Sequence, residues 1–265
     1  AIAGDRRQGL LPMAVVATAG TTSTTSVDPL PEIADVCRAE KVWLHVDAAY
    51  AGNAAICPEL RPLLAGWERA DSIVVNPYKW SFVPFDGSVL FVRDLDDLKA
   101  AFSLVPEYLR TTETGVVNLM DLGFQLGRRF RALKVWMSLR ALGAEGIRET
   151  IRRQVALARE MARRVEAAEG LELAAPAPFS TVCLRARLED GVGPAAEDAF
   201  NERVMEEMNR TGEVFLSHTR LDGRFVLRFV FGHLTIGERH LERVWSLLQD
   251  TVARLRAEGS QGEDR

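Results

Sequence analysis

The chain has 265 residues, 47% of them hydrophobic and 26% charged, which is typical of a globular protein and excludes disordered, collagen-like and coiled-coil classes. At about 150 residues per domain, this length fits one large domain or two smaller ones. The net charge of -4 argues against a nucleic-acid partner, and the longest apolar stretch is far shorter than the roughly 20 residues that cross a bilayer. We therefore expect neither nucleic-acid nor membrane binding.

The three cysteines, Cys37, Cys57 and Cys183, have no CxxC spacing. An odd number of cysteines without that spacing predicts neither a disulfide framework nor a zinc site, so no metal is expected. A reducing cytoplasm is the expected location.

The first part of the chain alternates short apolar runs with helix-like stretches, the pattern of strand-helix-strand units in a parallel sheet. A helix from Pro31 to about Glu40, with Asp28 as its expected cap, would connect the first two strands. The predicted strands are 13–18, 42–47, 72–75 and 88–92.

Residues 104–127 lose this periodicity, which is typical of a long functional or mobile loop. Two helices are expected at 128–142 and 144–168, with a break near Gly143 and Gly146. Helical spacing places Trp136, Leu139 and Leu142 in the expected core.

The last hundred residues indicate a small α+β domain. An Asp-Gly pair at 222–223 predicts a hairpin turn, and the tail 259–265 is polar. The predicted strands are 171–174, 181–187, 213–218 and 225–231, with helices at 195–210 and 238–256.

Two residues at strand ends carry the chemical argument. Asp47 ends one predicted strand, and Lys79 follows the next strand along the chain, so both are expected at the ligand-binding edge of a parallel sheet. A buried carboxylate needs a cationic partner, and a lysine in a partly apolar pocket can act as an amine nucleophile. Pyridoxal phosphate satisfies both, because its aldehyde condenses with lysine and its pyridinium nitrogen pairs with a carboxylate. Ala49 would leave room for its flat ring.

Each of these features also has an ordinary structural interpretation. A lysine after a strand is commonly a surface residue, a strand-end aspartate commonly caps a helix, and the Gly-Thr-Thr at 20–22 is a common turn. Arg228 is either a carboxylate binder or half of a buried ion pair. Only the order and spacing of the features together favour a cofactor site.

Several segments resemble the pyridoxal-phosphate-dependent aromatic L-amino-acid decarboxylases, which are group II decarboxylases of fold type I. The resemblance covers essentially the whole chain. Its segments are ATAGTT at 17–22, HVDAAYAG at 45–52, NPYKW at 76–80, VPEYLR at 105–110, LGRRF at 126–130 and FVLRF at 225–229.

The resemblance implies a role for each matching position. Lys79 resembles the lysine that forms the internal aldimine, and Asp47 the partner of the pyridine nitrogen. Tyr108 resembles the catalytic-loop tyrosine that donates a proton. The remaining matches are Ala49 on the ring face, Asn76 at the phosphate, Thr22 near the ring substituents and Gly127 in the substrate pocket. The chain departs from the family at Tyr78, where a histidine is usual, which puts the carboxylate contacts and the substrate choice in doubt.

The resemblance also implies a domain plan within an α/β, fold type I transferase-like protein. Residues 1–103 would be the C-terminal half of the large, mainly parallel-sheet domain, and 104–127 the mobile catalytic loop. Connecting helices at 128–168 would lead to the small α+β domain at 169–258 and the tail 259–265. Family members are nearly twice as long, so we expect a C-terminal portion that exposes apolar surface and is inactive alone.

The implied function is decarboxylation of an aromatic L-amino acid (tryptophan, tyrosine, phenylalanine or DOPA) to an arylalkylamine and CO2. The implied assembly is a homodimer with the active site at the subunit interface. The alternatives are another fold type I activity, either an acidic amino-acid decarboxylase or an aldehyde-forming aromatic acetaldehyde synthase, and an inactive fragment.

Overall fold

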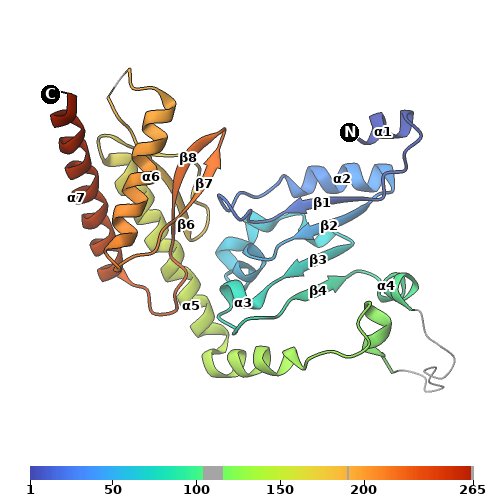
Figure 1. The fold of residues 1–265 in the computed structure, drawn as a ribbon. Coiled ribbons are helices and arrows are strands. Elements are labelled where there is room, and N and C mark those ends of the chain that lie inside the picture. The colour runs from blue at the N-terminus through green and yellow to red at the C-terminus, as the bar shows by residue number, and fades with distance from the viewer. Residues whose placement is uncertain (104–115, 190, 264–265) are drawn as a thin grey trace. The chain divides into compact units, whose positions relative to one another are not determined.

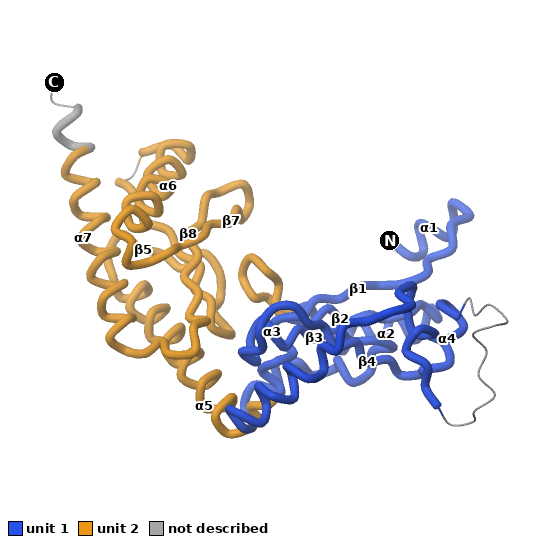
Figure 2. The backbone as a smooth tube through the Cα atoms, turned by 60° about the horizontal axis from the view of Figure 1, so that its bottom comes forward, with its two compact units in different colours: residues 1–19, 28–55, 59–143 blue, residues 20–27, 56–58, 144–265 orange. Residues whose placement is uncertain are grey.

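A computed structural model describes residues 1–103, 116–189 and 191–263 of the chain, with side chains up to residue 258. It separates into two compact units, shown in blue and orange in Figure 2. The first unit contains residues 1–19, 28–55 and 59–143, and the second contains residues 20–27, 56–58 and 144–265. Among the helices described, none combines the length and apolar character needed to cross a membrane.

The first unit is built on a four-stranded sheet (Figure 1). Three neighbouring strands run parallel, and the fourth pairs antiparallel to the third. The observed bounds of these strands lie within one residue of the predicted bounds, and the prediction of a mainly parallel α/β sheet is confirmed. In spatial order the strands are β1 (Ala14–Thr18), β2 (Trp43–Asp47), β3 (Ser72–Val75) and β4 (Val89–Val92).

Short helices connect these strands. The β1–β2 crossover is α2 (Leu30–Glu40), whose N-cap residue is Pro29 and which has no side-chain cap. The expectation that Asp28 caps it is wrong, because the Asp28 carboxylate accepts a hydrogen bond from the Thr18 N–H at 2.7 Å. The other helical segments are α1 (Ile2–Arg7), η1 (Ala51–Ile56), η2 (Pro58–Leu64), η3 (Trp67–Arg69), α3 (Pro77–Trp80), α4 (Leu95–Phe102) and η5 (Leu119–Leu122).

Apolar side chains of the first unit lie on its surface as well as in its core. Leu44 and Val46 are buried on one face of β2, whereas Val16 of the edge strand β1 is 63% exposed and Met13, just before β1, is 82% exposed. The expected exposure of apolar surface is therefore found in this unit.

The long helix α5 (Arg131–Ala167) contains the predicted break at Gly143, whose φ of 67° and ψ of 165° are non-helical. Before the break, Trp136 is 59% exposed and Leu139 is 46% exposed. Their predicted place in the core is wrong for the described chain, because no described element packs over this face of the helix. After the break, Ile147 and Ile151 are buried.

The second unit is an antiparallel sheet in the order β5-β6-β8-β7 with helices packed on it. Its core draws apolar side chains from β6, β8 and the helices α5, α6 and α7. Helix α7 continues to residue 263, beyond the predicted end at 256. The elements are β5 (Leu171–Leu173), β6 (Thr181–Ala186), α6 (Pro194–Arg210), β7 (Ser217–Leu221), β8 (Arg224–Val230) and α7 (Glu238–Glu263).

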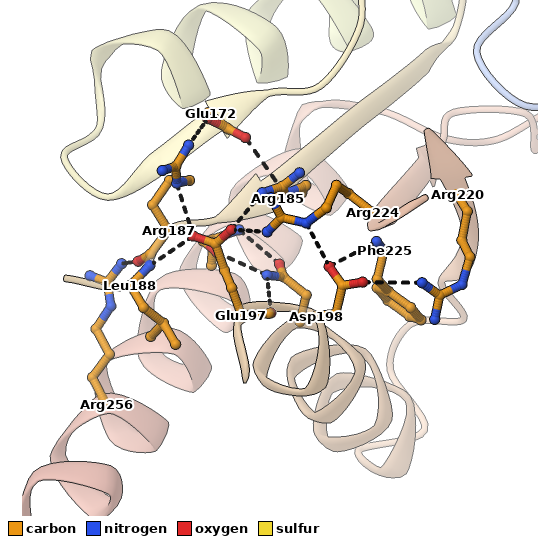
Figure 3. Close-up of polar contacts among 12 residues, drawn as sticks. Glu172, Arg185, Arg187, Leu188, Glu197, Asp198, Arg220, Arg224, Phe225 and Arg256 are labelled. Carbon is orange, nitrogen blue, oxygen red and sulfur yellow. Dashed lines mark hydrogen bonds and ion pairs between the residues drawn. The ribbon is translucent and has the colours of Figure 1, made fainter. Parts of the chain in front are cut away.

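A network of ion pairs connects α6 to this sheet (Figure 3). Its centre is Glu197, whose carboxylate is 7% exposed and pairs with Arg185, Arg187 and Arg224. Burial acts to raise the pKa of the Glu197 carboxyl, but hydrogen bonds from the Leu188 N–H, Arg224 and Arg185 outweigh it, so that its pKa is below the ordinary value.

Candidate active site

The strand β2 places Asp47 at the edge of the sheet where parallel strands end. In the register, Asp47 pairs with Thr18 of β1 and with Val74 of β3. Alternate residues of β2 are buried, so Leu44 and Val46 anchor the strand while Asp47 lies on the opposite, half-buried face. The predicted strand-end position of this carboxylate is confirmed.

Among the described residues, the Asp47 carboxylate has a backbone partner but no cationic one. Its Oδ1 accepts a hydrogen bond from the Ala49 N–H at 3.0 Å. Among the residues described, no lysine, arginine or histidine forms an ion pair with it. A half-buried carboxylate without a cation has the chemistry that a protonated ring nitrogen would complement.

Lys79 lies on a short helix directly after β3. Asn76 is the extended residue before α3, Pro77 begins the helix, and the Lys79 N–H donates to the Asn76 carbonyl at 3.0 Å. Trp80 is 1% exposed and stacks on Tyr50 at 4.5 Å between ring centroids, which anchors this helix to the loop after β2. The Lys79 side chain is exposed and forms no ion pair with the described residues.

Backbone hydrogen bonds join the loops that follow β2 and β3. The Asn76 N–H donates to the Ala49 carbonyl at 3.0 Å, and the Ala48 N–H donates to the Val74 carbonyl at 3.1 Å. A Cβ at Gly52 would lie 2.7 Å from a methyl carbon of Val75, so glycine is needed for this close approach. The structure thus brings Asp47 and Ala49 together with the segment that carries Asn76 and Lys79.

Asn76 has unused hydrogen-bonding capacity. Its Nδ2 donates to the Tyr78 hydroxyl at 3.2 Å, whereas its buried Oδ1 has no partner among the described residues. A buried polar atom without a partner is costly, and such atoms in native proteins commonly mark ligand or water sites. Together with the Asp47 carboxylate and the Lys79 amine, these residues fit a group that carries an aldehyde, a ring nitrogen and polar substituents.

Asn53 is a residue that the sequence reasoning missed. It is 6% exposed, and its amide bonds to both strand-end loops and to Ser81. The only signal in the sequence is a single amide within the apolar stretch AGNAAI at 51–56. That signal is too weak to have predicted a structural link between the two loops.

Thr22 lies in the loop 20–27, which belongs to the second unit. Its carbonyl accepts a hydrogen bond from Arg228 Nη2 at 2.7 Å, and the Ser23 carbonyl accepts one from Arg228 Nε at 2.7 Å. Arg228 Nη1 also donates to the Ser217 hydroxyl at 2.8 Å. Among the described residues Arg228 thus contacts carbonyl and hydroxyl oxygens rather than a carboxylate, so the buried ion pair considered for it is not found. The role of Thr22 beside the cofactor stays a prediction.

Tyr78 borders a pocket of about 680 Å³ in the first unit. Its ring meets Phe85 edge to face, with 4.9 Å between centroids. At the same pocket Asp86 pairs with Arg131 and Lys134, and the hydrogen bond from Arg131 holds the pKa of the Asp86 carboxyl far below its ordinary value. Gly127 is exposed, and a Cβ there would meet nothing within 4 Å. Tyr108 lies outside the described residues.

Several curated proteins are similar to this chain. Tryptophan decarboxylase 1 of Oryza sativa subsp. japonica is 41% identical over 261 residues, which cover 96% of this chain and 51% of that protein. Tyrosine decarboxylase 4 of Petroselinum crispum is 42% identical over 94% of the chain and 50% of its own length. Phenylacetaldehyde synthase of Arabidopsis thaliana is 38% identical over 96% of the chain and 52% of its own length. The chain therefore spans about half the length of these relatives.

A solved structure has the same fold. The crystal structure of Oryza sativa TDC with PLP and tryptamine matches with a TM-score of 0.90 and 39% identity, over 96% of this chain and 53% of that one. The model of the pyridoxal-dependent decarboxylase conserved domain matches residues 1–187. This chain belongs to the pyridoxal-dependent decarboxylase family.

Proposed function

We propose that the protein containing this chain binds pyridoxal phosphate and decarboxylates an aromatic L-amino acid to an arylalkylamine and CO2. One observation carries the proposal: the half-buried carboxylate of Asp47, which has no cationic partner among the described residues, lies on β2, and Lys79 follows the neighbouring strand β3. Membership of the decarboxylase family and similarity to tryptophan and tyrosine decarboxylases support the choice of reaction and substrate class.

The cofactor would be held by residues at the ends of β2 and β3. Asp47 would keep the ring nitrogen protonated, Lys79 would supply the amine, and Ala49, which is 8% exposed, would leave space against the ring face. Asn76 would contact the phosphate, and Thr22 the ring substituents. Bound pyridoxal phosphate supplies a sink for the electron pair that remains when CO2 leaves the substrate.

The remaining chemistry is proton delivery and exclusion of water. Tyr108 is the proposed proton donor, because a phenol with an ordinary pKa of about 10 stays protonated at neutral pH. A loop that closes over the site would also exclude water and oxygen. We place Gly127 and Tyr78 in the substrate pocket. Gly127 would affect which substrate side chain fits, and Tyr78 would affect the contacts with the substrate carboxylate.

A second candidate is an aldehyde-forming reaction, which the similarity to phenylacetaldehyde synthase favours. Both candidates release CO2, and the aldehyde-forming reaction also consumes oxygen. We further propose a cytoplasmic homodimer whose active site lies at the subunit interface. Sedimentation of the intact protein at twice the monomer mass would support the dimer, and a monomer that is fully active would contradict it.

The products of the wild-type protein separate the two candidate reactions, and Tyr108→Phe tests the proposed proton donor. Without the phenolic proton, the variant should produce less amine and more oxygen-dependent aldehyde than the wild type. Both products are measured from tryptophan, tyrosine, phenylalanine and DOPA, with and without oxygen, and the wild-type panel also identifies the preferred substrate. An unchanged amine yield with no aldehyde would remove Tyr108 from the mechanism.

A further inference from the structure

The Asn53 side chain joins the two strand-end loops of the candidate site. Its Nδ2 donates to the Tyr50 carbonyl at 2.9 Å on the loop after β2, and to the Asn76 carbonyl at 3.2 Å at the end of β3. A longer contact of 3.3 Å reaches the Ala49 carbonyl. One buried amide therefore contacts the backbone on both sides of the site.

The surroundings fix the orientation of this amide. Oδ1 of Asn53 accepts a hydrogen bond from the Ser81 hydroxyl at 2.6 Å. If the amide were reversed, its oxygen would face three carbonyl oxygens and could accept no hydrogen bond from them. Ser81 is the C-cap residue directly after α3, the helix that carries Lys79. Asn53 is thus bonded to the segment before Lys79 and to the segment after it.

We propose that Asn53 is a positioning residue for pyridoxal phosphate, holding the Lys79 helix in register with the Asp47–Ala49 segment. The inference rests on the proposed function. Asn53 itself is buried and acts through the backbone of Ala49, Tyr50 and Asn76 and through Ser81. A buried amide with several partners restricts both loops to one spacing, which preorganises the amine and the carboxylate for the same ligand.

The second unit contains a matched control. Asn201 is 1% exposed, and its Nδ2 donates to the Ala186 and Glu197 carbonyls, each at 2.9 Å. Its Oδ1 accepts from the Ala186 N–H at 2.8 Å. Asn201 therefore makes the same kind of buried amide bridge, but it bonds to none of the strand-end residues of the first unit. Asn53→Ala and Asn201→Ala therefore each remove one buried amide bridge between backbone segments.

The test compares these variants in the intact protein by titration with pyridoxal phosphate. Asn53→Ala should raise the cofactor dissociation constant about tenfold, because the net free energy of one hydrogen bond corresponds to about that factor in affinity. The variant should also weaken the visible circular dichroism of the bound cofactor. Asn201→Ala should lower the melting temperature of the cofactor-free protein while leaving the dissociation constant and the circular dichroism unchanged.

Ser81→Ala, which removes only the donor to Asn53 Oδ1, keeps the test decisive if Asn53→Ala does not fold. It should weaken cofactor binding by a smaller factor. If Asn53→Ala or Ser81→Ala matches Asn201→Ala in cofactor affinity and circular dichroism, the positioning role is overturned and the proposed function stands. If the wild type binds no pyridoxal phosphate, the proposed function fails instead, and the inference fails with it.

Discussion

At the residue scale, Glu197 links stability to pH. Its arginine partners and the Leu188 N–H lower its pKa despite burial. A carboxyl whose pKa is lowered by folding stabilises the protein above its unfolded pKa of about 4.3, and this contribution is lost as pH falls through the folded pKa. Removing the charge at neutral pH leaves Arg185, itself 8% exposed in its side chain, without its buried partner.

We predict that Glu197→Gln lowers the free energy of unfolding by about 3–5 kcal/mol at neutral pH, the usual cost of breaking a buried ion pair. Urea unfolding should show a smaller loss of stability in the variant than in the wild type as pH falls below about 4. Glu206→Gln is the control, since Glu206 forms an exposed pair with Arg210 on the same helix at 3.6 Å. Equal pH dependence in wild type and Glu197→Gln would contradict this role.

The strand-end residues differ in how far the sequence could predict them. Asp47 and Lys79 were predictable at their places because each follows an apolar run, and the ends of parallel strands meet at one edge. Asn53 was not predictable, because its partners at Asn76 and Ser81 are 23 and 28 residues away and leave no local pattern. The roles of the predicted residues came from the family resemblance rather than from spacing.

At the element scale, the hairpin turn decides the position of β7. The strand was predicted at 213–218, on the apolar run at 214–216, but it occupies Ser217–Leu221. The Asp222-Gly223 turn has positive φ at both residues and pairs Leu221 with Arg224, which fixes the register. Phe215 in the apolar run is 90% exposed, so the position of β7 is determined by the turn rather than by the apolar run.

This turn gives a prediction for Gly223, whose φ is 78°. Gly223→Ala should lower the free energy of unfolding by about 1 kcal/mol, because an L side chain is strained at this φ although the space around it is open. Gly232→Ala is the control, since a Cβ there would make an ordinary contact of 3.6 Å with Val230. Thermal unfolding of both variants checks this, and equal melting temperatures would show that the turn is not strained.

At the scale of the whole molecule, local pattern predicted the elements better than their assembly. The α/β class, the break at Gly143 and the small α+β domain follow from periodicity and from glycine. The attachment of the loop 20–27 to the second unit could not be predicted from local pattern, because Arg228 and Ser23 are 205 residues apart in the sequence. The exposed Trp136 shows the same limit, because helical spacing identifies an apolar face but not what packs on it.

The central claim is that Lys79 carries pyridoxal phosphate. Its most direct test is borohydride reduction of the intact protein with bound cofactor, followed by peptide mass spectrometry. The account predicts a phosphopyridoxyl group on the peptide containing Lys79, and none on peptides containing Lys41, Lys99, Lys134 or any lysine of the intact protein outside this chain. A phosphopyridoxyl group on another lysine, or no modified lysine at all, would contradict it.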